Sequence, residues 1–114
     1  MRKTAAVAVL MAACAASGNP GTYEAVLPAA SGGERHIRVV LQPDGFAAMS
    51  SAFSARPSRF LAEGTWVAEG RRVTVNLDNQ KIMVFERAGD QLAAREWDRA
   101  TWGEDGPGVL FRVR

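Results

Sequence analysis

From residue 21 onward, hydrophobic and polar residues alternate in short runs that are separated by turn-forming residues. The clearest run is Arg72 to Leu77, in which Val73, Val75 and Leu77 alternate with polar residues. A period of two places the apolar side chains on one face of a β-strand. The same pattern predicts strands at residues 22–27, 36–42, 46–53, 60–68, 72–77, 81–87, 91–96 and 109–113.

Most connections between these strands are short, and Pro43-Asp44-Gly45 is the strongest turn because proline presets φ and glycine supplies a positive φ. The longest connection, residues 97–108, is expected to be irregular, and no sustained helical period occurs beyond residue 20. Short connections favour an antiparallel meander. We expect the strand at 109–113 to pair with the first strand, because closure removes exposed edges without disulfides. The predicted fold class is therefore all-β, a small barrel of about eight strands.

The first twenty residues follow a different pattern. Arg2 and Lys3 precede an uncharged run from Ala5 to Ala13. This run is too short to span a bilayer, which takes about 20 apolar residues, and it matches the roughly 7–15 residues of a secretory signal core. Small residues then lead to Cys14, as is typical of bacterial lipoprotein signal peptides.

That class of signal implies a diacylglycerol on the Cys14 thiol, cleavage before Cys14 and acylation of the new amine, so that the protein would label with palmitate. We predict a cleaved signal peptide at residues 1–13, a tether at 14–20 and a barrel domain at 21–114. Met11 stands where the class prefers leucine. An ordinary secretory signal cut after a small residue and a structural helix are the alternatives.

Cysteine usage agrees with export, because Cys14 is the only cysteine and a free thiol is a liability in an oxidising compartment. Several acyl chains, each contributing about 0.8 kcal/mol per buried CH₂, anchor stably where one does not. Ala15 is not the aspartate of an inner-membrane retention signal. The predicted location is therefore the outer membrane, on its periplasmic face.

Removal of residues 1–13 changes the charge balance. The whole chain has 14 basic and 12 acidic side chains, and loss of Arg2 and Lys3 leaves 12 − 12 = 0. Nucleic-acid binding depends on clustered positive charge, and Arg71-Arg72 is the only adjacent basic pair of the predicted mature chain. The sequence therefore predicts no nucleic-acid partner.

Three motifs in order carry a family resemblance: Gly21 to Pro28 with its Gly-x-Tyr-x-x-x-Leu-Pro pattern, Val39 to Gly45, and Glu63-Gly64-Thr65-Trp66 followed by Val73-Thr74-Val75. Together they resemble the N-terminal domain of NlpE, a family of outer-membrane lipoproteins linked to copper resistance and envelope-stress signalling. The resemblance covers residues 21–114 and implies a small barrel related in shape to lipocalins. It also implies that Glu63-Gly64-Thr65-Trp66 and the Leu27-Pro28 corner are framework and not active site.

The chain departs from this family where Cys-x-x-Cys often follows Leu-Pro, because the matching positions here are Ala29 and Gly32. Copper sites are built from clustered Cys, Met or His side chains. His36, Met49 and Met83 are scattered along the chain. We therefore predict no metal site and no cofactor, and the copper role is not carried over.

His36, the only histidine, is expected to face solvent on its strand, opposite Ile37 and Val39. A Ser-His-acid triad would have to use it, and no nucleophile-elbow motif occurs. The sequence also contains no phosphate-binding glycine loop. We therefore predict that the protein is not an enzyme.

Two groups of residues leave alternatives open. The acidic region is expected to be a solvated loop, with a calcium site or a partner surface as alternatives; it contains Glu96, Asp98, Glu104 and Asp105, interspersed with Trp97 and Trp102. Most of the aromatic side chains are expected to fill the barrel, with a pocket for an apolar ligand as the alternative. This set is Trp66, Trp97, Trp102, Phe46, Phe53, Phe60, Phe85 and Phe111.

The combined prediction is a non-enzymatic, monomeric outer-membrane lipoprotein with an NlpE-like barrel and a role in binding or in sensing envelope stress. Its partners would be the membrane, through the lipid, and an envelope protein. One alternative is a carrier of a small lipophilic ligand, which a large interior cavity would favour. The other is a periplasmic inhibitor of a cell-wall enzyme.

Overall fold

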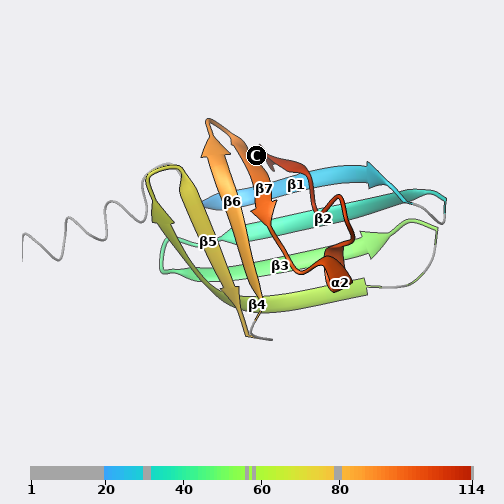
Figure 1. Cartoon of the computed structure of the whole chain (residues 1–114), viewed down its shortest axis with the longest axis horizontal. Coiled ribbons are helices and arrows are strands. Elements are labelled where there is room, and N and C mark those ends of the chain that lie inside the picture. The colour runs from blue at the N-terminus through green and yellow to red at the C-terminus, as the bar shows by residue number, and fades with distance from the viewer. Residues whose placement is uncertain (1–19, 30–31, 56, 58, 79–80, 114) are drawn as a thin grey trace, which may run out of the picture.

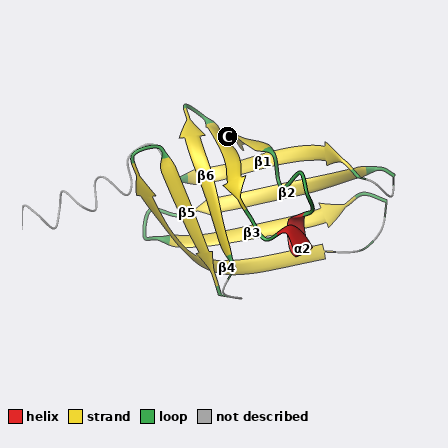
Figure 2. Ribbon diagram, in the orientation of Figure 1, coloured by secondary structure: helices red, strands yellow, loops and turns green. Residues whose placement is uncertain are grey.

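The computed structural model describes residues 20–29, 32–55, 57, 59–78 and 81–113 (Figure 1). Eight strands form one closed antiparallel barrel in chain order, which confirms the predicted all-β meander. Within the described residues, one helix of four residues interrupts the strands (Figure 2). In chain order the elements are β1 (Gly21–Pro28), β2 (Glu34–Leu41), β3 (Phe46–Phe53), β4 (Arg59–Glu69), β5 (Arg72–Leu77), β6 (Ile82–Ala88), β7 (Gln91–Glu96), α2 (Arg99–Trp102) and β8 (Val109–Val113).

The barrel closes where the sequence predicted. β8 pairs antiparallel with β1, with Thr22 opposite Val113 and Glu24 opposite Phe111. The other edge of β8 pairs with β7, so the last strand fills the gap between the first and the seventh. Closure satisfies the backbone groups that an open sheet would expose. The predicted signal peptide, the tether up to residue 19 and Cys14 lie outside the described residues.

Strand β4 is the longest strand and joins the two halves of the barrel. Its first part pairs with β3 and its second part with β5. Gly64 lies at the change of partner, opposite both Ala47 and Leu77. A Cβ at this position would lie 1.9 Å from the carbonyl oxygen of Asn76, so only glycine permits the approach. Figure 1 shows β5, β6 and β7 crossing the direction of β1, β2 and β3 beyond this strand.

The barrel interior is filled with apolar side chains along most of its length. Fully buried residues come from both halves and include Tyr23, Ile37, Met49, Phe85 and Leu92. Inward positions alternate with outward ones as predicted, and in β5 the buried residues are Val73, Val75 and Leu77. This part of the barrel is therefore a packed core.

Trp66 belongs to the framework, as the family resemblance implied. Its ring is buried in the core, and its indole N–H donates to the carbonyl oxygen of Gln42 at 2.7 Å. The hydrogen bond ties β4 to the Pro43-Asp44-Gly45 turn, which forms as predicted, with φ at +95° for Gly45. Buried tryptophans generally need such a partner for the indole N–H.

The structure differs from the sequence interpretation at two places in residues 97–113. The connection 97–108 contains helix α2, whose single turn is too short to produce a recognisable helical period. Most of the aromatic side chains were expected to fill the barrel, and Phe111 is an exception, with 52% of its surface exposed. Successive side chains of a strand point to opposite faces, so Phe111 points outward because its neighbour Leu110 is buried.

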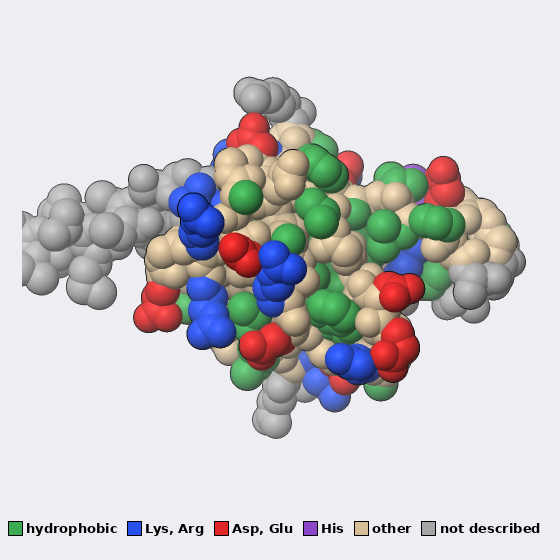
Figure 3. Space-filling view, turned by 45° about the horizontal axis from the view of Figure 1, so that its top comes forward, with side chains coloured by type: hydrophobic (Ala, Val, Ile, Leu, Met, Phe, Trp, Pro, Cys, Tyr) green, Lys and Arg blue, Asp and Glu red, His purple; other side chains and the backbone are tan. Residues whose placement is uncertain are grey.

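Phe111 belongs to a short apolar stretch on the outside of the closing strands. Val26, Val109 and Val113 are also exposed hydrophobic residues of β1 and β8. Figure 3 shows hydrophobic side chains across the middle of one face, between charged groups. Among the described residues, no helix has the length and apolar character needed to cross a membrane.

Candidate binding pocket

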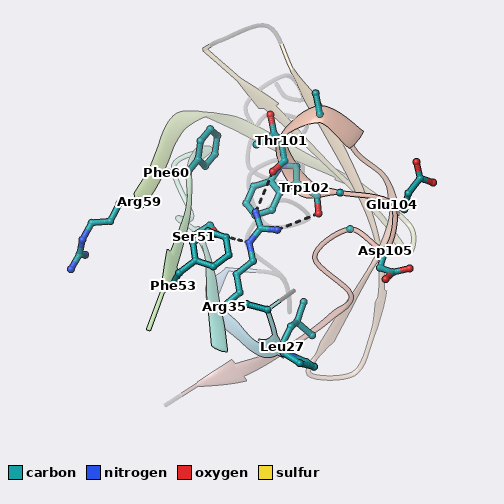
Figure 4. Close-up of a pocket in the computed structure, with 15 residues that line it drawn as sticks. Leu27, Arg35, Ser51, Phe53, Arg59, Phe60, Thr101, Trp102, Glu104 and Asp105 are labelled. Atoms are coloured by element: carbon teal, nitrogen blue, oxygen red, sulfur yellow. Dashed lines mark hydrogen bonds between the residues drawn. The ribbon is translucent and has the colours of Figure 1, made fainter. Parts of the chain in front are cut away.

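The candidate site is a pocket of about 690 Å³ at the end of the barrel where β1 ends and β2 begins (Figure 4). The segment around α2 forms one wall and the ends of β1 to β4 form the others. Its volume lies within the range of small-molecule sites. The lining residues are Leu27, Pro28, Ala29, Arg35, Ser51, Phe53, Arg59, Phe60, Ala100, Thr101, Trp102, Gly103, Glu104, Asp105 and Gly106.

The pocket is the part of the barrel interior that the core leaves unfilled. Leu27 continues the inward-facing positions of β1 beyond Tyr23 and Ala25, and Phe60 precedes the buried Ala62 on β4. Cross-strand pairing brings the lining residues together, since Arg35 lies opposite both Leu27 and Phe53. The pocket therefore opens directly onto the core at one end of the barrel.

Arg35 occupies the centre of this pocket (Figure 4). Its Nε donates to the Ser51 hydroxyl at 2.7 Å, and its two terminal nitrogens donate to the carbonyl oxygens of Trp102 at 3.2 Å and Thr101 at 3.3 Å. The guanidinium also lies over the rings of Phe53, at 5.2 Å, and Trp102, at 4.9 Å. Arg35 thus joins β2, β3 and the α2 segment, and it is held in one orientation.

The wall formed by α2 is packed against the strands. The Trp102 side chain is 3% exposed and meets the Phe60 ring edge-on at a centroid distance of 5.4 Å. The Trp97 indole N–H donates to the Gly103 carbonyl oxygen at 2.8 Å. Gly106 lies directly against the Trp97 ring, where a Cβ would be 2.5 Å from the nearest ring atom. These contacts fix the position of the wall relative to the barrel.

Asp98 is the N-cap residue that precedes helix α2, and the pKa of its carboxyl is lowered. The Thr101 hydroxyl donates to its carboxylate at 2.5 Å, and the Lys81 ammonium lies 3.5 Å away. These contacts, the Thr101 hydrogen bond first, hold the pKa of Asp98 below its usual value against the opposing effect of desolvation. The ionised carboxylate therefore stabilises the first turn of the wall.

The fold does not bring together the residues that were considered as possible ligands or catalytic groups. His36 is on the outer face of β2, as predicted; its side chain is 53% exposed and lies 3.4 Å from Glu34. Met49 and Met83 are buried in the core. Of the two positions that match the family's cysteines, Ala29 lines the pocket and Gly32 is exposed in the loop that follows β1.

The predicted acidic region is spread along the β7–β8 connection. Glu96 lies 4.0 Å from Arg72, and Glu104 pairs with Arg99 at 2.8 Å. Glu104 and Asp105 are exposed at the pocket rim. In the part of the chain that the structure describes, no three His, Cys, Asp or Glu side chains gather into a metal-binding group.

Arg35 is the site residue that the sequence interpretation missed. The second strand was predicted to begin at residue 36, but β2 begins at Glu34. Extending the inward positions Leu41, Val39 and Ile37 back by two residues reaches Arg35. The alternation of inward and outward positions along β2 was the signal that could have found Arg35. A charged residue at an inward position is unusual enough to mark a candidate site.

Comparisons with known proteins identify the fold. No family model and no curated protein matches the chain. Among solved structures, the Cpx pathway activator NlpE from Escherichia coli is similar with a TM-score of 0.61 at 22% identity, over 68% of this chain and 42% of that one. The chain therefore spans less than half of the NlpE chain.

Two other solved structures are similar over more of their own length. The lipoprotein YedD from Klebsiella pneumoniae has a TM-score of 0.62 at 12% identity, over 86% of this chain and 74% of that one. A Shewanella oneidensis protein named as a lipoprotein has a TM-score of 0.53 at 22% identity, over 82% and 87%. At these identities the likeness establishes the fold, and the chain has the barrel fold of NlpE that its sequence motifs predicted.

Proposed function

We propose that this chain is a lipid-anchored protein of the cell envelope, held at the periplasmic face of the outer membrane through Cys14. Its barrel would have a binding or stress-sensing role and no catalytic one. The likeness to solved structures that carry the name lipoprotein supports the anchor. The uncharged run before Cys14 and the small residues around it support it independently.

The observation that carries the proposal is that the tether and the pocket meet opposite ends of β1. Gly21 begins the strand, and Pro28 ends it at the pocket. An eight-residue strand with a rise of about 3.3 Å per residue separates the two by about 23 Å. The pocket would thus face away from the anchoring membrane, as suits a site that receives a molecule from the periplasm.

At the end of β1 nearer the tether, Tyr23 packs against Arg112 of β8. There the Arg112 guanidinium lies over the Tyr23 ring at 5.3 Å and donates to its hydroxyl at 2.9 Å. Residues 14–20 can reach at most about 25 Å when extended, so the barrel would stay close to the membrane.

The hydrogen-bond partners of the two hydroxyl groups in the pocket favour a binding role over a catalytic one. The Ser51 oxygen accepts from Arg35 of β2, and the Thr101 hydroxyl donates to Asp98 at the start of the α2 wall. Serine and threonine nucleophiles are usually activated by an adjacent imidazole or amine, and His36, the only histidine, lies on the outer face of β2. The geometry around these hydroxyls instead serves to shape the pocket.

The anchor is tested by labelling the full chain with radioactive palmitate and measuring the intact mass of the mature protein. We expect label and a mass that corresponds to cleavage before Cys14. Cys14→Ser should give an unlabelled, uncleaved precursor. Ala16→Leu is the matched control, because it blocks an ordinary cut after residue 16 and leaves lipoprotein processing intact. A soluble, unlabelled wild-type protein would refute the anchor, and density-gradient fractions would test the outer membrane.

A further inference from the structure

The polar groups at the base of the pocket are hydrogen-bonded to one another. Each of the three guanidinium nitrogens of Arg35 donates to an acceptor of the protein. The acceptors are the Ser51 hydroxyl and the carbonyl oxygens of Thr101 and Trp102. A ligand that bonded to these groups would have to break hydrogen bonds that already exist, so it would gain little from a polar group of its own.

The charged side chains at the mouth are directed away from the interior. Figure 4 shows Arg59 on one side, and Glu104 and Asp105 on the other, pointing outward from the pocket. Glu104 pairs there with Arg99 at 2.8 Å. These side chains keep their hydration at the rim, and they leave the walls of the pocket to apolar groups.

Three partly exposed apolar side chains form those walls. Leu27, Phe53 and Phe60 are half-buried and line the pocket. Leu27 and Phe60 pack against the core on one side, so the remainder of their surface is turned to the open space. Removing water from apolar surface is favourable, and concave apolar surface is typical of small-molecule sites. The walls therefore favour a hydrocarbon surface.

We infer that this pocket binds an uncharged molecule that is mostly hydrocarbon and fits a volume of about 690 Å³. The ligand lies against Leu27, Phe53 and Phe60 and leaves the hydrogen bonds of Arg35 in place. Arg35 thus holds the α2 wall in position and does not select the ligand. The inference rests on the proposed binding role and adds the ligand class to it.

The first test varies the charge of the ligand on the unaltered protein. Mature protein in phosphatidylcholine nanodiscs is titrated with octanol, octanoate and octyltrimethylammonium at pH 8, and free concentrations are corrected with empty nanodiscs. Binding is followed by NMR of the Leu27 methyl groups, with those of Leu110, which is buried in the core, as internal reference.

We expect octanol to shift the Leu27 signals saturably and to bind at least about ten-fold more tightly than either ion, because a charge loses hydration in the pocket. Octanoate binding as tightly as octanol, or more tightly, would show that the charge of the ligand is recognised and would overturn the inference. The absence of a saturable shift with octanol would overturn it as well.

The second test removes one wall. Phe60→Ala should weaken octanol binding about ten-fold, because the ring supplies apolar surface to the pocket. Phe111→Ala is the matched control, since Phe111 is exposed on the outside of the barrel, and it should leave binding within about two-fold. Equal losses in the two variants would contradict the assigned site. If Phe60→Ala does not fold, the ligand series on the unaltered protein decides.

The inference and the proposed anchor fail separately. Palmitate labelling of Cys14 does not depend on the pocket. An anchored protein whose Leu27 signals do not respond to octanol would refute the inference and leave the anchor standing, whereas octanol binding by an unlabelled protein would do the reverse.

Discussion

Replacement of Gly64 by alanine tests the junction that brings the two halves of the barrel together. The new Cβ would lie 1.9 Å from the Asn76 carbonyl oxygen and 2.8 Å from the Leu77 Cα. Both atoms belong to the backbone of β5, so relief requires the ladder between β4 and β5 to move. Overpacking costs about 1–3 kcal/mol and occasionally more, and a backbone clash falls at the upper end. We expect a loss of about 3 kcal/mol.

This loss is large for a small domain, whose total stability is about 5–15 kcal/mol. It should lower Tm by about 12–24 °C, since 1 kcal/mol corresponds to about 4–8 °C at this size. Circular dichroism in a thermal or urea titration measures the change.

Gly89→Ala is the matched control for the Gly64 substitution. Gly89 has φ at +60°, and a Cβ there would meet nothing within 4 Å. The control therefore isolates the conformational cost of alanine, about 1 kcal/mol. A Gly64→Ala protein that is no less stable than Gly89→Ala would show that the close approach of β4 to β5 is not what requires glycine.

Three further substitutions test the core and the pocket wall. Trp66→Phe should cost about 1 kcal/mol in urea unfolding, because it removes the hydrogen bond to the Gln42 carbonyl while keeping a ring; an unchanged midpoint would contradict that role. Phe85→Ala should cost about 3–5 kcal/mol, since the ring is fully buried, and a cost under about 1 kcal/mol would mean that the core is not packed as described. The lowered pKa of Asp98 means that its contribution is present above its unfolded pKa and is lost as pH falls through the lower folded value. NMR titration of the Asp98 carboxyl should therefore give a midpoint below 3.8 that Thr101→Val raises, and an unshifted midpoint in that variant would refute the Thr101 contribution.

Much of the barrel was predictable because its strands are half buried. Wherever one face packs inward and the other meets water, the sequence must alternate, and β3, β5, β7 and β8 begin and end at the predicted residues. The closing pair of β1 and β8 was also predictable, because unpaired edges are costly. Helix α2 was not, because one turn held by Asp98 and Thr101 leaves no periodic pattern.

The pocket depended on tertiary structure. Alternation determines which side chains point inward, and by that rule Arg35 and Ser51 were already inward residues. Whether an inward position is filled or left open depends on what faces it across the barrel, and local sequence does not encode that. Only the folded chain brings Trp102 against Arg35, 67 residues away, and leaves a pocket beside them. The sequence by itself determined the strands, their inward faces and the predicted anchor at Cys14; the closed barrel decided where the core ends.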